Sequence, residues 1–141
     1  MIIKAVSHTR VHYGSFLDYV LDEEKQIDPE SQWRIVENID CVPTDKKGLE
    51  RAYLKNARLK PKRKNGVVMY HELISASPNS GATPEIMYDL TLQYLKLRNT
   101  KNGLAVASMH ADKNHLHVHI MLSGNEQGGE RSTALSRKEF Y

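Results

Sequence analysis

The sequence predicts an α+β domain in which helices pack on the faces of an antiparallel β-sheet. Apolar, β-branched runs that are typical of strands open the chain and recur in its second half. Segments with a helical spacing of apolar residues separate these runs. The last two expected strands, 104–112 and 115–123, are joined only by Lys113 and Asn114, and so short a connection requires antiparallel strands. This order of elements is typical of the α+β class.

The N-terminal part of the chain predicts one strand and one short helix. Residues 1–6 are hydrophobic and rich in β-branched side chains, which predicts the first strand. Ser15 is typical of a helix N-cap, and the apolar residues after it predict a short helix that ends near Leu21. Residues 22–33 are polar, so we expect an exposed loop there.

The middle of the chain predicts a second helix and a second strand. Residues 34–42 are apolar but show no clear period, so they predict no regular element. Thr44 is expected to cap a helix that runs to about residue 59, because apolar residues recur on related turns. The stretch 60–66 contains a proline and a glycine and ends that helix. Residues 67–77 then predict a long strand.

The third helix has the clearest start in the chain. Thr83, Pro84 and Glu85 provide an N-cap, a proline at the first helical position and an acid in the first turn. We expect this helix to reach about residue 98 and to bury one stripe of side chains at three- and four-residue steps. The residues of that stripe are expected to be Ile86, Leu90, Gln93 or Tyr94, and Leu97.

The register of the last two strands decides where their histidines point. If residues 113–114 form a two-residue loop, His110 lies opposite His117 and Ser108 lies opposite His119. Residues that pair directly share one face of a sheet, so His110, His117 and His119 would cluster there. The aliphatic residues that alternate with the histidines would face the core. A three-residue loop would move His110 to the opposite face.

Three neutral imidazoles that converge on one point make a site for a divalent metal ion. We expect the open, catalytic kind of site, because three protein ligands leave coordination positions for a substrate oxygen. Asp112 is expected to orient one imidazole through the ring nitrogen that does not bind the metal. His115 lies on the same face nearer the turn and receives no role. Structural histidines without a metal are the alternative interpretation.

Length and composition indicate a single soluble domain. A chain of 141 residues holds one hydrophobic core, and 40% hydrophobic and 26% charged residues are ordinary for a globular protein. No apolar run approaches the roughly 18 residues that cross a bilayer, so we expect no membrane contact. Cys41 is the single cysteine, which excludes an internal disulfide and favours the cytoplasm. Ser136 and Glu139 form a capping box, so we expect residues 1–141 to be a domain truncated at its C-terminal end.

The net charge of +3 is unevenly distributed. Seven basic residues lie between positions 51 and 64, and no acidic residue interrupts them. Positive charge of this density attracts phosphate backbones. A solvated helix face is the plainer interpretation of a charge run, but a neighbouring metal site favours nucleic acid. The residues expected to contact DNA are Arg51, Lys55, Arg58, Lys60, Lys62, Arg63 and Lys64.

The histidine pattern resembles that of a known enzyme family. His110-Ala-Asp112, followed after four residues by His117-Val-His119, resembles the HUH motif of relaxases, the nicking enzymes of plasmid and transposon mobilisation. In that family two histidines flank a hydrophobic residue, and a third lies upstream with an aspartate two positions after it.

Other segments extend the resemblance over nearly the whole chain. Residues 14–21, which include Tyr19, are similar to the segment that carries the tyrosine nucleophile of relaxases. Residues 71–78 resemble the intervening strand motif, although Ala76 stands where an aromatic residue is usual. Residues 129–141 are similar to the stretch that follows the metal strand.

The resemblance implies an HUH-endonuclease fold and a site- and strand-specific DNA transesterase. Bound Mg²⁺ or Mn²⁺ would polarise the scissile phosphate of single-stranded DNA at an origin of transfer. Tyr19 would attack that phosphorus and leave a free 3′-hydroxyl and a 5′-phosphotyrosyl enzyme. Accessory mobilisation proteins are further expected partners. Ser75, Glu72 and His12 are candidates for auxiliary roles, the latter two as a general base.

Several alternatives remain open on the sequence alone. Tyr13 and Tyr141 are competing nucleophiles, and Tyr19 fits simple packing as well. The run from His115 through His117 to His119 also fits the histidine-triad pattern of nucleotide hydrolases, which use the middle histidine without metal. A DNA-binding module that contains a structural metal is a third interpretation of the same residues.

Overall fold

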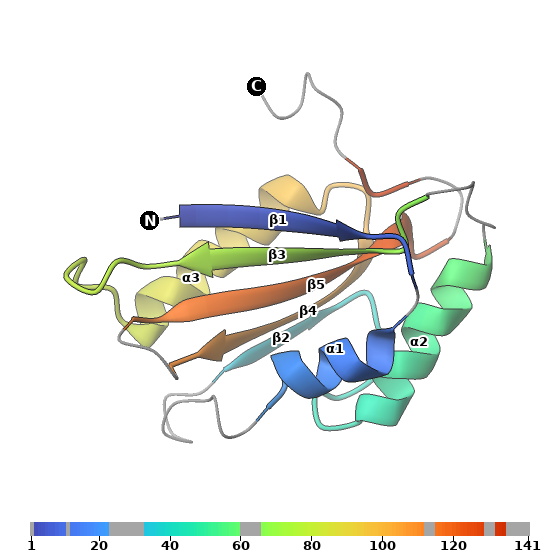
Figure 1. The fold of residues 1–141 in the computed structure, drawn as a ribbon, viewed down its shortest axis with the longest axis horizontal. Coiled ribbons are helices and arrows are strands. Elements are labelled where there is room, and N and C mark those ends of the chain that lie inside the picture. The colour runs from blue at the N-terminus through green and yellow to red at the C-terminus, as the bar shows by residue number, and fades with distance from the viewer. Residues whose placement is uncertain are drawn as a thin grey trace.

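A five-stranded antiparallel sheet in the order β1-β3-β5-β4-β2 organises the protein (Figure 1). The computed structural model describes residues 2–10, 12–22, 33–59, 66–111, 115–128 and 132–134. The elements are β1 (Ile2–His8), α1 (Tyr13–Val20), β2 (Arg34–Glu37), α2 (Lys46–Leu59), β3 (Met69–Ser75), α3 (Pro84–Arg98), β4 (Gly103–His110) and β5 (His117–Glu126). The predicted α+β class with an antiparallel sheet is confirmed.

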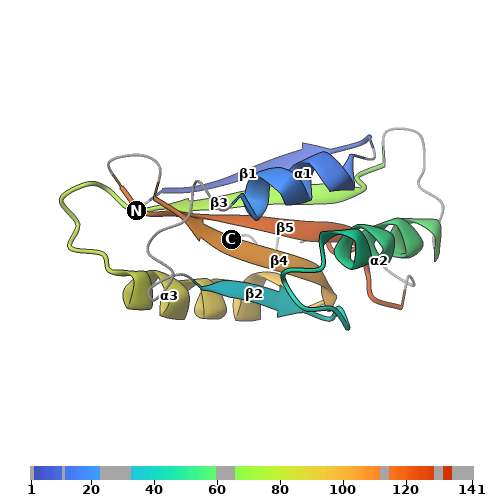
Figure 2. The same ribbon diagram turned by 90° about the horizontal axis from the view of Figure 1, so that it is seen from below.

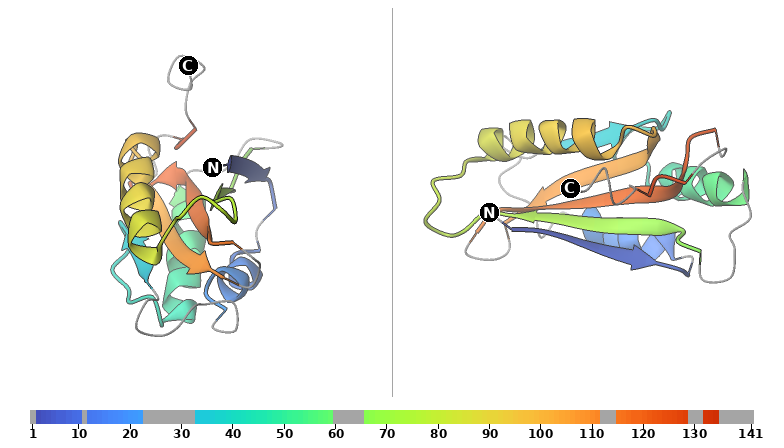
Figure 3. Two further views of the ribbon diagram at one scale, coloured as in Figure 1. Left: turned by 90° about the vertical axis from the view of Figure 1, so that its left-hand side faces the viewer. Right: turned by 90° about the horizontal axis from the view of Figure 1, so that it is seen from above.

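Helices cover both faces of this sheet, with α3 on one face and α1 and α2 on the other (Figures 2 and 3). Each face therefore has its own hydrophobic cluster. Val118, Ile120 and Leu122 of β5 belong to the cluster under α3. Met121, between them in the sequence, belongs to the cluster under α1 and α2. The alternation of side chains along a strand thus supplies both cores from one element.

The structure confirms the expected register of the last two strands. His110 pairs with His117 and Ser108 pairs with His119. The aliphatic residues of β5 that alternate with these histidines are fully buried on the opposite face, as expected. Both sides of the strand are thereby occupied, so a shift of one residue would bury the imidazoles in an apolar core.

Two helix starts differ from the prediction. Ser15 is not an N-cap, because α1 begins at Tyr13 and the Ser15 hydroxyl donates to the carbonyl of His12 at 3.0 Å. Asp45 takes the place predicted for Thr44, since its carboxylate accepts from the backbone N–H of Gly48 at 3.0 Å. The short strand β2 was not predicted. It pairs only with β4 and buries one side chain, Ile35, so its sequence has no alternating pattern to detect.

The start of α3 was predicted correctly, but its buried face only in part, since Leu90 and Tyr94 of the predicted stripe pack against the core as partly buried residues. The Thr83 side chain accepts from the backbone N–H of Ile86 at 3.2 Å, which confirms the cap. Ile86 and Leu97, however, are 51% and 77% exposed. The helix is rotated from the predicted orientation, and this places two polar residues, Thr91 and Arg98, in the buried layer. Both form hydrogen bonds there, Thr91 to the carbonyl of Met87 and Arg98 to Glu72. The residues that α3 buries are Met87, Thr91, Leu95 and Arg98.

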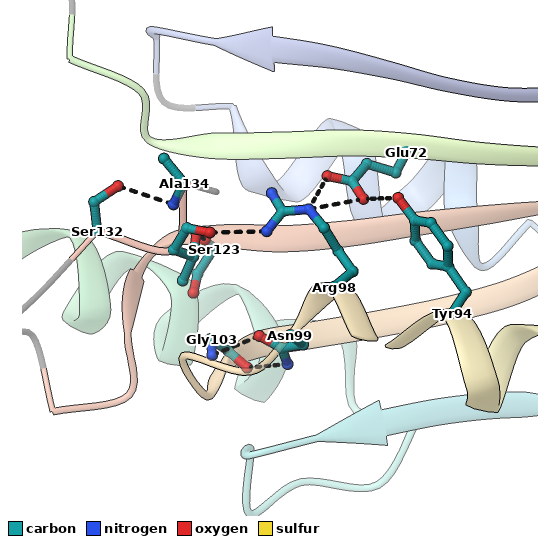
Figure 4. Close-up of polar contacts among 9 residues, drawn as sticks. Glu72, Tyr94, Arg98, Asn99, Gly103, Ser123, Ser132 and Ala134 are labelled. Atoms are coloured by element: carbon teal, nitrogen blue, oxygen red, sulfur yellow. Dashed lines mark hydrogen bonds and ion pairs between the residues drawn. The ribbon is translucent and has the colours of Figure 1, made fainter. Parts of the chain in front are cut away.

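Arg98 is buried because Glu72 of β3 meets it across the layer (Figure 4). Its Nε donates to the Glu72 carboxylate at 2.9 Å, and its Nη1 donates to the carbonyl of Thr133 at 2.8 Å. The Tyr94 hydroxyl donates to the same carboxylate. These bonds offset the cost of removing two charges from water.

The remaining predicted segments fall mostly on residues that the structure does not describe. These are the loops expected at 22–33 and 60–66, the turn at 113–114 and the helix expected to begin after Ser136. Within the described ranges, no helix has both the length and the apolar character needed to cross a membrane.

Candidate metal centre and active site

Three buried histidines converge on the face of the sheet that α1 covers. His110 ends β4, while His117 and His119 lie two residues apart on β5 and so share a face. Each offers a ring nitrogen, and the offered atoms all lie within 4.8 Å of one another. These are the three residues predicted to cluster, and the strand pairing of His110 with His117 is what brings them together.

Hydrogen bonds orient two of these rings through the main chain. Nε2 of His110 donates to the carbonyl of Val20 at 2.8 Å, which leaves Nδ1 as the nitrogen with a lone pair. Nδ1 of His117 donates to the carbonyl of His115 at 3.4 Å, so Nε2 carries the lone pair there. Metal-binding imidazoles commonly donate their second nitrogen in this way. The donor set therefore fits a divalent metal ion.

The third ring is held by a residue that the sequence did not single out. His71 of β3 places its Nε2 2.8 Å from Nδ1 of His119, and the two ring planes are nearly parallel with centroids 5.1 Å apart. Burial, and then the charges of His8 and His110, lower the pKa of His71 below its usual value. The alternation of β3 puts His71 and Ser75 on one face, but only the pairing of β3 with β5 shows that it is the face of the histidine cluster.

Tyr19 lies at the rim of this cluster, on the last turn of α1. Its ring meets the rings of His119 and His110 edge-on, at centroid distances of 5.0 Å and 5.6 Å. The residue is 41% exposed and lines an open cavity, so a substrate can reach it from solvent. Leu17 and Val20, which are fully buried, hold α1 against the sheet and thereby set the position of Tyr19.

Tyr13 has the opposite environment on the same helix. It is 2% exposed, and its hydroxyl donates to the carbonyl of Val68 at 3.1 Å. Burial raises its pKa to about 12, which disfavours the phenolate that a nucleophile needs. Tyr141, the other competing nucleophile, lies outside the described residues.

The three auxiliary candidates are placed differently. Glu72 pairs with Ile120, so its side chain lies on the α3 face, away from the histidines, where Arg98 binds it. It is therefore not positioned to act as a base for Tyr19. Ser75 pairs with His117 and shares its face. His12 precedes α1, with its ring 5.0 Å from that of His8.

A cavity of about 300 Å³ opens beside the cluster. Its walls are Ser15, Phe16 and Tyr19 from α1 and His71 from β3. Phe16 meets His71 edge-on with ring centroids 5.3 Å apart, so the cavity is walled mainly by rings. Because His71 also contacts His119, the cavity and the histidine cluster share a wall.

Part of the predicted DNA-binding set can be located. Arg51, Lys55 and Arg58 are exposed on α2, which packs beside α1 through a shared hydrophobic cluster. The other predicted residues of the site lie outside the described ranges. They are Lys60, Lys62, Arg63, Lys64 and Asp112.

A family model described as relaxase, MobA/VirD2-like, nuclease domain matches residues 19–136. The chain belongs to the MobA/VirD2-like relaxases. The resemblance inferred from the HUH pattern is thereby confirmed, and this relaxase has the α+β architecture expected of it. A search of curated proteins returned no match. The cluster contains His110 rather than His115. Together with the family match, this composition argues against a histidine-triad hydrolase.

Proposed function

We propose that this relaxase nicks single-stranded DNA at an origin of transfer during plasmid or transposon mobilisation. The observation that carries the proposal is the contact of an accessible tyrosine, Tyr19, with two members of a buried three-histidine cluster. The membership of the chain in a nuclease family supports it. Such a reaction takes place in the cytoplasm, where accessory mobilisation proteins would meet the enzyme.

His110, His117 and His119 would hold the metal ion. When bound, the ion would act as a Lewis acid that polarises a phosphate oxygen. Of the two ions considered, the all-imidazole donor set favours Mn²⁺, because Mg²⁺ is harder and prefers oxygen ligands. Asp112 is proposed to support one ligand, and Ser75 and His12 remain candidates for contacts with the substrate.

Tyr19 would act as the nucleophile. Its hydroxyl oxygen forms a bond to the scissile phosphorus while the bond from phosphorus to the 3′ oxygen breaks. The tyrosine loses its proton and the 3′ oxygen gains one, so the products are a free 3′-hydroxyl and a 5′-phosphotyrosyl enzyme. The phosphodiester is exchanged rather than hydrolysed, so the reverse step can rejoin the strand.

The basic residues are proposed to bind the DNA backbone. Arg51, Lys55 and Arg58 give α2 an exposed positive face next to the helix that carries Tyr19. Lys60, Lys62, Arg63 and Lys64 would extend that face along the chain. Lysine and arginine bind phosphates without regard to sequence.

Covalent capture tests the proposal without knowledge of the nick site. A random pool of 5′-labelled and 3′-labelled single-stranded oligonucleotides is incubated with the protein and MnCl₂ and resolved on a denaturing gel. We expect adducts in which the protein is attached to the 5′ end of the downstream fragment, and none with EDTA. Cleavage that survives EDTA, or products with a free 5′-phosphate throughout, would contradict the proposal.

A further inference from the structure

His71 occupies a specific place relative to the metal cluster. It lies on β3 directly across from Met121 of β5, diagonal to His119. The Nε2 of His71 is 2.8 Å from Nδ1 of His119, and the two rings are nearly parallel, with an interplanar angle of 18°. Phe16 flanks His71 at 5.3 Å between ring centroids, so the ring is held from the side of α1 as well.

The bond between the two rings limits which nitrogen of His119 can bind a metal. A neutral imidazole has one nitrogen with a proton and one with a lone pair. If Nδ1 of His119 donates to His71, the lone pair of His119 lies on Nε2. Rotation of the ring by half a turn would break this bond, so a hydrogen-bond acceptor at position 71 selects one orientation and one tautomer.

We propose that His71 is a positioning residue of the metal centre, whose Nε2 accepts a hydrogen bond from Nδ1 of His119 and so directs Nε2 of His119 toward the ion. The inference rests on the metal centre of the proposed function. Backbone carbonyls of Val20 and His115 have the corresponding role for His110 and His117. For His119 the acceptor is a side chain, so substitution can remove it.

Calorimetric titration with MnCl₂ tests this role without reference to DNA cleavage. His71→Leu removes the acceptor, and we expect its affinity for Mn²⁺ to fall by about 10- to 100-fold, as for other partners of metal ligands. His71→Gln retains an acceptor oxygen and is expected to bind Mn²⁺ nearly as tightly as the wild type. His115→Leu is the matched control, because it removes a nearby imidazole but keeps the carbonyl that binds His117.

The outcomes separate this inference from the proposed function. If His71→Leu binds Mn²⁺ like the wild type, or His71→Gln loses as much affinity as His71→Leu, His71 is not an acceptor for His119. The metal centre itself would stand in that case, provided that the wild type binds Mn²⁺ and His119→Ala does not. A wild-type protein that fails to bind Mn²⁺ would overturn both.

A measurement on the wild type avoids dependence on the folding of the variants. The ¹⁵N spectrum of the histidine side chains, recorded with the diamagnetic ion Zn²⁺, which imidazoles bind well, reports the proton on each ring nitrogen. We expect a proton on Nδ1 of His119 and none on Nε2 of His71. A proton on Nε2 of His71 that points to His119 would overturn the inference.

Discussion

At the scale of single residues, the environment of a side chain decides its chemistry more than its identity does. Tyr13 and Tyr19 lie on the same short helix and have the same intrinsic reactivity. Tyr13 is buried with its hydroxyl bonded to Val68, and its pKa is raised to about 12. Tyr19 is 41% exposed and touches the histidine cluster. Of these two tyrosines, Tyr19 is the one that combines exposure with proximity to the three-histidine cluster.

These environments predict opposite effects of removing the two hydroxyls. Tyr19→Phe is expected to abolish covalent DNA adducts on a denaturing gel and to leave Mn²⁺ affinity unchanged. Tyr13→Phe is expected to retain the adducts but to lower the free energy of unfolding by about 1 kcal/mol, because a buried hydrogen bond is lost. Urea denaturation measures the second effect. Adducts formed by Tyr19→Phe would show that another residue is the nucleophile.

At the scale of elements, neighbouring residues of β3 serve different faces of the sheet. His71 meets His119 on the face of the histidine cluster, whereas Glu72 meets Arg98 and Tyr94 on the α3 face. One strand therefore supports the site with one residue and the core with the next. We therefore expect that the stability of the fold and the affinity of the proposed site for metal can be altered separately.

Glu72→Gln tests this separation. It leaves the guanidinium of Arg98 buried without a counter-charge, which is expected to lower the free energy of unfolding by about 3–5 kcal/mol. Urea denaturation would detect this loss. The Mn²⁺ affinity of the folded protein is expected to remain at the wild-type value, because Glu72 lies on the other side of the sheet. A marked loss of affinity would place Glu72 in the metal site after all.

The features that were predictable from sequence depend on local geometry. The pairing of His110 with His117 was predictable because the sequence leaves only a short connection between the two expected strands, and because histidines alternate with aliphatic residues along the second one. The buried face of α3 was not predictable in the same way, because apolar residues lie all around this helix and the burial of Arg98 depends on distant Glu72. His71 was missed for a related reason, since its role requires that β3 and β5 be neighbours.

At the scale of the whole molecule, the histidine cluster joins segments that are far apart in the chain. His110 and His119 come from β4 and β5, Val20 binds His110 from α1, and His71 binds His119 from β3. An ion that binds only this folded arrangement stabilises all four elements together. The metal-free protein is accordingly expected to unfold more readily than the loaded protein.

Thermodynamic linkage gives the size of this effect. At a free Mn²⁺ concentration one hundred times the Kd, the free energy of unfolding should rise by about 2.7 kcal/mol. Urea denaturation with MnCl₂ and with EDTA measures the difference. His119→Ala serves as the control and should show the same stability under both conditions. Equal stabilisation of His119→Ala would locate the binding elsewhere.

The distribution of charge predicts how DNA binding responds to salt. Each contact with a phosphate of a single strand contributes about −0.7 to the slope of log K against log salt. If Arg51, Lys55 and Arg58 each contact one phosphate, the triple substitution by Gln should reduce the magnitude of the slope by about 2. Fluorescence anisotropy of a labelled oligonucleotide in EDTA, which prevents cleavage, measures this slope. An unchanged slope would show that these three residues of α2 do not contact the phosphates of the DNA.

The placement of Tyr19 on a helix rather than on a strand has a consequence for genetics. Leu17, two residues before the tyrosine on α1, is completely buried between the helix and the rest of the core. A smaller side chain at this position would loosen the docking of the helix and displace the reactive oxygen, while the imidazoles on the strands kept their places. A mutagenesis screen for loss of DNA nicking would thus also recover substitutions of Leu17, which would resemble the loss of Tyr19 in that Mn²⁺ affinity is kept. A lower free energy of unfolding, from the cavity left in the core, would distinguish them from Tyr19→Phe.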